Sequence, residues 1–114
     1  MSTNPSSAPA AGADASTIGH DELVAGLNSG ALALVDVREP DEFAAGHIPG
    51  AANLPMSRFD AALLPQGKPV ALVCQTGRRS GIALGQAKEA GRADVRHYAP
   101  GTKGWRDGGG PLER

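Results

Sequence analysis

A single cysteine stands at the head of a short polar and basic segment. The segment follows the apolar run 70–73 and reads Cys74, Gln75, Thr76, Gly77, Arg78, Arg79, Ser80. A loop of this kind, curled around a sulfur atom, can direct several backbone N–H groups at it and form an anion-binding nest. Two arginines and the start of a following helix add positive charge. All of these effects favour the thiolate over the thiol, so the segment predicts a nucleophilic cysteine.

Residue counts and spacings exclude several other chemistries. One cysteine rules out an internal disulfide, a cysteine-rich zinc site and a CxxC redox pair. The three histidines, His20, His47 and His97, lack the close spacing of metal ligands. A net charge of −1, without aromatics interleaved among the basic residues, argues against nucleic-acid binding. The structural alternative for Cys74 is a small buried hydrophobic residue that ends a strand.

The elements that must position Cys74 alternate between strand-like and helix-like segments. We expect strands over 32–37, 70–73 and 94–98, and a turn with a very short strand within 47–55. We expect helices over 20–28, 40–45, 57–64 with Ser57 as its cap, and 80–90, and a turn or short helix over 101–107. This alternation predicts an α/β fold with a parallel sheet. Ligands of such sheets bind beyond the carboxyl ends of the strands, where Cys74 stands.

The composition of the chain outside the loop predicts its domain organisation and its compartment. Residues 1–15 are mostly Ser, Ala, Pro and Gly, which predicts a disordered N-terminal tail before one domain over 16–114. No apolar run is long enough for a membrane helix, and the first basic residue is Arg38, which argues against a signal or transit peptide. We therefore expect a cytoplasmic protein without membrane contact, in a compartment where a free thiol survives.

Charge is distributed unevenly along the chain. Residues 14–60 sum to −6 (eight acids, two bases) and residues 61–106 to +6 (eight bases, two acids). Two interpretations stay open. The two halves pair with each other inside one domain, or the basic half creates a positive field around an anion site near Cys74.

Two stretches carry a resemblance to a known family. LVDVREPDEFAAGHIPGAANLP (34–55), followed by VALVCQTGRRS (70–80), closely resembles the single-domain rhodanese-like sulfurtransferases, and the similarity extends over about 17–113. The resemblance implies a rhodanese-like α/β fold: an open, mainly parallel sheet of about five short strands with helices on both faces. It also implies a nucleophile at Cys74 that accepts a sulfane sulfur and becomes a persulfide.

The resemblance assigns further roles position by position. The rest of the six-residue loop would bind substrate: its amides would hold the persulfide, and its arginines would guide an anionic donor such as thiosulfate. The residues concerned are Gln75, Thr76, Gly77, Arg78 and Arg79. Asp36 and Arg38 match the DxR of the family at a strand end, and with Ser80 they are the expected supporting residues.

The residues themselves suggest contacts for several of these positions. Asp36 ends a strand and could brace the neighbouring loop, and Arg38 is expected to pair with Glu42 or Asp41. His47 is expected to be hydrogen-bonded in a turn. Trp105 is expected to pack in the core or at its rim.

Loop length separates sulfur transfer from phosphate chemistry. Phosphatases and arsenate reductases on related folds carry the motif C-x5-R, in which an arginine stands six positions after the cysteine. Here that position is Ser80. A tetrahedral phosphate would lose its bidentate partner, so the spacing suits a smaller sulfur-bearing site.

The implied mechanism is a two-step transfer without a cofactor. The Cys74 thiolate takes sulfur from the donor, and cyanide or a thiol then removes it. No general base is needed if the thiolate already exists, which agrees with the absence of a histidine near the loop in sequence. Two alternatives are a persulfide carrier that serves a protein acceptor and a non-catalytic interaction module. We expect a monomer.

Four positions depart from the family pattern. Gln86, Ala87 and Arg92 stand where members usually carry larger apolar residues, and Pro100 replaces the first of two glycines. Proline fixes φ near −65°, which excludes a positive φ at that position. These departures predict looser packing behind the helix that follows the loop and leave the loop itself unchanged.

Overall fold

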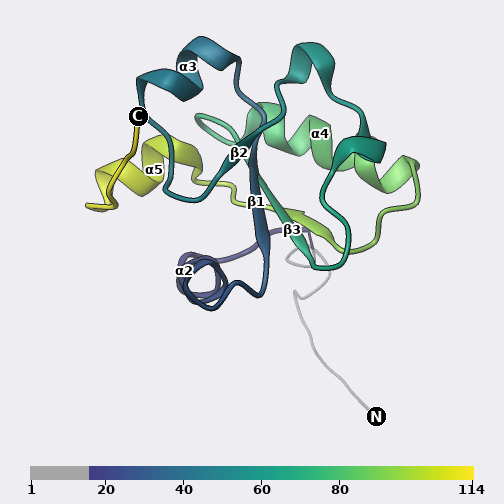
Figure 1. Ribbon diagram of the computed structural model, residues 1–114, viewed down its shortest axis with the longest axis horizontal. Coiled ribbons are helices and arrows are strands. Elements are labelled where there is room, and N and C mark those ends of the chain that lie inside the picture. Colours follow the sequence, from purple (N-terminus) through teal and green to yellow (C-terminus); the bar gives the residue numbers. More distant parts are fainter. Residues whose placement is uncertain (1–15) are drawn as a thin grey trace.

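A parallel sheet forms the centre of the molecule (Figure 1). The computed structural model describes residues 16–114, so the predicted tail over 1–15 lies outside the described residues. Within them the sheet has the strand order β2-β1-β3-β4, and each neighbouring pair is parallel. The strands are β1 Ala33–Asp36, β2 Ala52–Asn53, β3 Val70–Val73 and β4 Val95–His97. The α/β fold with a parallel sheet is confirmed.

The described sheet has four strands, where about five were expected. At the β4 edge a single parallel bridge, Thr17 to His97, continues the pairing without forming a strand. β3 is central and buried along its whole length, as its continuous apolar run predicts for a strand covered on both faces.

Helices cover both faces of the sheet. They are α2 His20–Ser29, α3 Pro40–Ala45, α4 Arg78–Glu89 and α5 Gly101–Asp107. Two 3-10 turns, η1 Met56–Arg58 and η2 Ala61–Leu63, lie between β2 and β3. None of the helices in residues 16–114 is long and apolar enough to cross a membrane.

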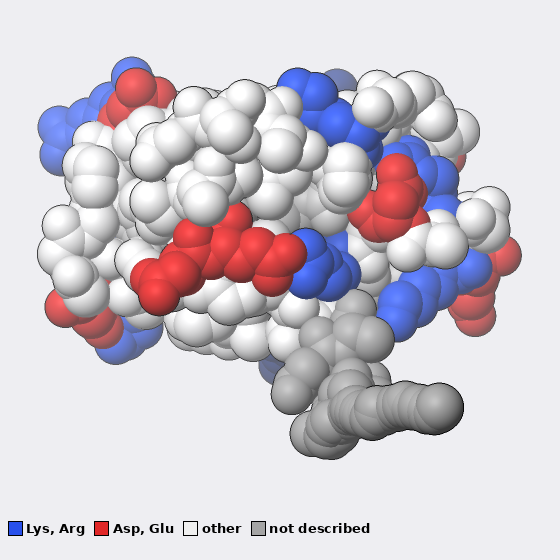
Figure 2. Space-filling view, turned by 90° about the horizontal axis from the view of Figure 1, so that it is seen from below, with Lys and Arg blue, Asp and Glu red and all other residues white. Residues whose placement is uncertain are grey.

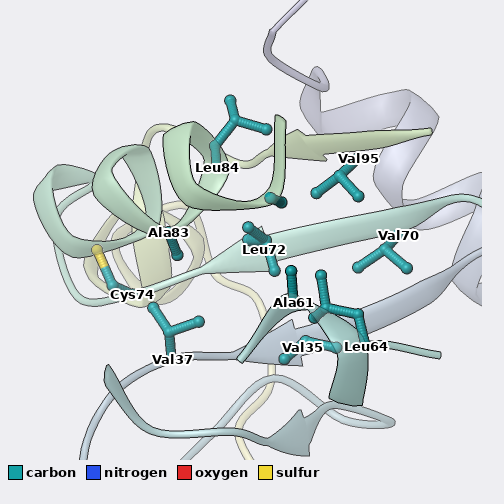
Figure 3. Close-up of a cluster of buried hydrophobic side chains, with 11 residues drawn as sticks. Val35, Val37, Ala61, Leu64, Val70, Leu72, Cys74, Ala83, Leu84 and Val95 are labelled. Atoms are coloured by element: carbon teal, nitrogen blue, oxygen red, sulfur yellow. The ribbon is translucent and has the colours of Figure 1, made fainter. Parts of the chain in front are cut away.

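Alternate strand residues divide the core into two clusters. On one face Val35, Leu72 and Cys74 pack with Ala83 and Leu84 of α4 (Figure 3). The other cluster joins the intervening strand residues to α2 and α5; its members are Ile18, Leu23, Leu34, Ile48, Ala71, Val73, Tyr98 and Trp105. Because side chains alternate across a strand, Cys74 falls on the α4 face.

The predicted helix over 57–64 is wrong. Phe59 has extended backbone angles (φ −67°, ψ 129°), which separate the two 3-10 turns. Asp60 caps the second turn by accepting from the Ala62 amide at 2.9 Å. Ser57 is not a cap, because its hydroxyl donates to the Glu39 carboxylate at 2.6 Å.

Behind α4 the unusual residues have distinct environments. Ala87 is completely buried in the core, whereas Gln86 is exposed. Arg92 donates to the Pro65 carbonyl at 3.0 Å and forms an ion pair with Asp94. Its Nη1 is buried without a hydrogen-bond partner. Burial of this nitrogen of the charged guanidinium without a hydrogen bond lowers the stability of the fold.

Charged groups from the two halves of the sequence meet in the fold. Glu22 pairs with Arg96 at 2.7 Å, and Glu42 with Arg79 at 2.6 Å. On the face that Figure 2 shows, acidic and basic side chains lie beside one another at several places. Pairing inside one domain therefore accounts for part of the uneven charge distribution.

The buried centre of β3 gives a direct test of the fold. Leu72 is 0% exposed, so we expect Leu72→Ala to lower the free energy of unfolding by about 2–5 kcal/mol through lost burial and a cavity. The matched control is Leu63→Ala, because Leu63 is 64% exposed; it should change stability by less than about 0.5 kcal/mol. Urea denaturation measures both. Equal stability of the two variants would contradict the placement of β3.

Candidate active site

Cys74 lies directly after β3, at the carboxyl edge of the sheet, where the chain turns into α4. The Gly77 amide donates a hydrogen bond to its sulfur at 3.0 Å. Gly77 adopts φ +95°, and a Cβ there would collide with the Ala99 carbonyl, so glycine is required on two counts. Gly77 is also the N-cap of α4, so the helix begins at Arg78, two residues before the expected start. The positive end of the helix dipole therefore lies close to the sulfur.

The sulfur of Cys74 is almost completely removed from water. The residue is 1% exposed. Burial by itself raises the pKa of the thiol, but hydrogen bonds from Ser80 and from the amides of Ser80, Thr76 and Gly77 outweigh it. The pKa of Cys74 is therefore lowered overall, as the loop sequence predicts.

Ser80 links the sulfur to a histidine that the sequence did not single out. Its hydroxyl oxygen lies 3.5 Å from the Cys74 sulfur and 2.9 Å from Nδ1 of His97. It also lies 3.2 Å from the Gly77 carbonyl. Burial, and to a lesser degree the charge of Lys88, lower the pKa of His97.

Asp36 and Arg38 form a buried ion pair beside the loop. Their side chains are 0% and 5% exposed, and Nη2 of Arg38 donates to Asp36 at 2.9 Å. The expected pairing of Arg38 with Glu42 or Asp41 is wrong. Asp36 is fully buried at a strand end and needs a cation close by, and the Arg38 guanidinium lies against it.

The Arg38 guanidinium also connects β1 to the loop. Its Nη1 donates to Oε1 of Gln75 at 3.3 Å, and its Nη2 donates to the Gly46 carbonyl at 2.7 Å. The bracing role expected for Asp36 thus runs through Arg38 to the loop residue that follows Cys74. His47, next to Gly46, is hydrogen-bonded to the Phe43 carbonyl at 2.9 Å, as expected.

The start of α5 holds the loop from the other side. The Thr102 amide donates to the Cys74 carbonyl at 2.8 Å, and the Lys103 amide to that of Gln75 at 3.0 Å. Gly101 takes φ +73° directly above these carbonyls, where a Cβ would collide with Gln75. Pro100 precedes it with φ −61°, so the positive φ falls on the glycine that remains.

The two loop arginines differ in their surroundings. Arg79 forms a two-pronged ion pair with Glu42, at 2.6 and 3.0 Å. The hydrogen bond from Arg79 is the main reason why the pKa of Glu42 falls to about 2. The side chain of Arg78 is exposed and has no hydrogen-bond or ion-pair partner among residues 16–114. Thr76 is exposed as well.

A pocket of about 390 Å³ adjoins the loop at Gln75. Its lining comes from α3, the loop, α5 and the C-terminal segment, and comprises Arg38, Glu42, Ala45, Gly46, Gln75, Thr102, Arg106 and Leu112. In the described part of the chain, no three His, Cys, Asp or Glu side chains are grouped closely enough to hold a metal ion. Trp105 is buried and donates to the Pro111 carbonyl at 2.7 Å, as expected of a packing residue.

The chain is similar to known proteins over most of its length. Residues 19–107 match the family model of the rhodanese-like domain. The chain is 35% identical over 111 residues to the human thiosulfate:glutathione sulfurtransferase, covering 82% of this chain and 95% of that protein. The structure of the human single-domain sulfurtransferase TSTD1 superposes with a TM-score of 0.70 and 31% identity, covering 81% of this chain and 96% of that one.

Some relatives are much longer. The chain is 43% identical over 98 residues to the "probable adenylyltransferase/sulfurtransferase MoeZ" of Mycobacterium tuberculosis, which covers 82% of this chain but 25% of that protein. It spans 47% of an uncharacterized protein of Synechocystis. The family model matches most of the described residues and the human relative is similar over nearly its whole length, so the chain belongs to the rhodanese-like domain family.

Proposed function

We propose that the protein is a sulfurtransferase that carries a sulfane sulfur on Cys74. One observation carries the proposal: a buried cysteine sulfur receives a backbone N–H hydrogen bond at 3.0 Å, lies beside the Ser80 hydroxyl and has a lowered pKa. A thiolate that is stabilised by donors in place of water is ready to attack an electrophilic sulfur.

Two displacement steps complete the reaction. The Cys74 thiolate attacks the outer sulfur of thiosulfate, the sulfur–sulfur bond breaks, and sulfite leaves with the electron pair. An acceptor thiolate or cyanide then attacks the terminal sulfur of the persulfide. The Cys74 thiolate departs as the leaving group, which restores the starting state.

The loop supplies binding groups for these steps. We assign the amides of Thr76 and Gly77 to the persulfide and the side chain of Gln75 to the rim of the adjoining pocket. Arg79 is engaged by Glu42, which leaves Arg78 as the exposed cation for an incoming anion. The human relative is named for thiosulfate and glutathione, which supports a small anionic donor and a thiol acceptor here.

The cysteine count decides where the sulfur goes. Cys74 is the only cysteine of the 114 residues. No second thiol among these residues can discharge the persulfide into a disulfide, so the sulfur must pass to an acceptor outside them. This requirement suits a transferase and a carrier equally.

A second candidate is a carrier that delivers the persulfide sulfur to a partner protein. The observation that favours it is the relative MoeZ, whose printed name joins sulfurtransferase with adenylyltransferase in one chain. A carrier predicts loading of Cys74 from a persulfide donor with little turnover of thiosulfate. A phosphatase is disfavoured, because Ser80 stands at the arginine position of C-x5-R and Arg79 is bound to Glu42.

Intact-mass spectrometry tests the role of Cys74. After incubation with thiosulfate, the wild-type protein should gain the mass of one sulfur atom, because a persulfide forms on Cys74. Cyanide should then remove it and release thiocyanate. Cys74→Ser is the matched control, since it keeps the size of the side chain, and it should gain nothing. Loading by a persulfide donor alone supports the carrier; an unloaded wild-type protein with both donors contradicts the proposal.

Steady-state kinetics tests Arg78. We expect Arg78→Gln to raise the KM for thiosulfate about three- to tenfold, because an exposed cation beside the loop is lost. The effect should shrink with added salt, which screens surface charge. Lys68→Gln is the matched control: Lys68 precedes β3 at the opposite edge of the sheet and donates to the Gly30 carbonyl. An unchanged KM in Arg78→Gln would exclude this residue from donor binding.

A further inference from the structure

His97 is a partly buried side chain that the proposed mechanism leaves unused. It ends β4 and reaches Ser80 of α4 through Nδ1, at 2.9 Å. Ser80 is fully buried, and its oxygen lies 3.5 Å from the Cys74 sulfur. Three side chains from three elements thus form a continuous hydrogen-bonded row that ends at the nucleophile.

The number of hydrogen atoms limits how this row can be arranged. Ser80 has one hydroxyl hydrogen and three neighbours within hydrogen-bond distance: the Cys74 sulfur, the Gly77 carbonyl and Nδ1 of His97. If Nδ1 carries a hydrogen, it donates to Ser80, and Ser80 is free to donate to the sulfur. If Nδ1 lacks one, Ser80 donates to the ring, and the sulfur loses its hydroxyl donor.

We propose that His97 is a positioning residue for the sulfur-transfer reaction: it donates through Nδ1 to Ser80 and thereby directs the Ser80 hydroxyl hydrogen at the Cys74 thiolate. The inference rests on the proposed function, because persulfide formation on Cys74 requires the thiolate that Ser80 would stabilise. His97 touches neither substrate nor sulfur and acts only through Ser80.

The protons can be accounted for when Cys74 changes from thiol to thiolate within this chain of hydrogen bonds. In the thiol state the sulfur donates to Ser80, Ser80 donates to Nδ1, and the ring proton is on Nε2. On ionisation the thiol proton moves to the Ser80 oxygen and the former hydroxyl proton moves to Nδ1. The Nε2 proton leaves to water. One proton is released, and the ring is neutral before and after.

The surroundings of His97 favour the neutral ring that this exchange needs. Burial and the positive charge of Lys88, the charged residue of α4 that acts on the ring, both lower the pKa of His97. Directly after β3 the titratable group is Cys74 itself, which His97 reaches through Ser80. In the segment before α2, the backbone carbonyl of Ser16 accepts from the His97 amide, and its hydroxyl oxygen accepts from Lys88.

Titration of the Cys74 thiolate tests the proposal without any sulfur transfer. The rate of alkylation by iodoacetamide, followed against pH, reports the thiolate in each variant. We expect Ser80→Ala to raise the pKa of Cys74 by about one unit or more, because a hydrogen bond to a charged group is lost. His97→Leu should raise it by a smaller amount, because Ser80 stays and turns toward the Gly77 carbonyl.

Two further variants separate positioning from simple packing. In the Ser80→Ala background, His97→Leu should cause no additional shift, because His97 acts only through Ser80. His97→Asn places an amide donor near the position of Nδ1 and should restore a pKa close to that of the wild type. His20→Asn is the matched control, since His20 is exposed and forms a hydrogen bond with Tyr98. It should leave the pKa of Cys74 unchanged.

A measurement on the wild-type protein needs no variant to fold. Imidazole nitrogen NMR above the pKa of Cys74 should show the hydrogen of His97 on Nδ1. An Nε2–H ring in that state, an unchanged or lowered pKa in His97→Leu, or additive shifts in the double variant would each overturn the inference. Failure of sulfur loading on Cys74 would instead refute the proposed function while leaving the thiolate titration interpretable.

Discussion

A sulfur atom that is removed from water but must carry charge is the constraint on which the rest of the structure depends. Burial of Cys74 raises its pKa, so donors from the protein have to replace the lost hydration. They are present only because the chain turns sharply after β3 and points the Gly77 amide at the sulfur. The same turn sets the start of α4 and the left-handed conformation of Gly77.

Three neighbouring elements keep this turn in place, and each holds a different atom. From the segment after β1, the Arg38 guanidinium reaches the Gln75 side chain, and from α5 the Thr102 amide donates to the Cys74 carbonyl. From β4, His97 reaches Ser80. A site supported by hydrogen bonds from separate rigid elements keeps its donors aligned before substrate arrives, which is the condition for electrostatic stabilisation.

Charge around the loop is divided between support and recognition. Glu42 holds Arg79, and because the pKa of Glu42 is about 2 the pair stays ionised at neutral pH. Arg38 is committed to the buried Asp36. Arg38 and Arg79 are therefore bound to carboxylates, and we propose that the exposed Arg78 is available to an anion. The resemblance to the family assigned Arg78 and Arg79 the same role.

Local patterns in the sequence determined the parallel α/β fold and the place of Cys74 after a buried strand, because apolar runs, turn residues and helix starts involve near neighbours. They failed over 57–64, where an extended Phe59 interrupts the helix, and at Arg38, whose partner is the buried Asp36. Only the tertiary structure decided the contacts of Ser80 with His97, 17 positions away, and of Cys74 with Thr102, 28 positions away. Such contacts depend on which strands and helices become neighbours, and that outcome follows from packing of the whole sheet rather than from any short segment.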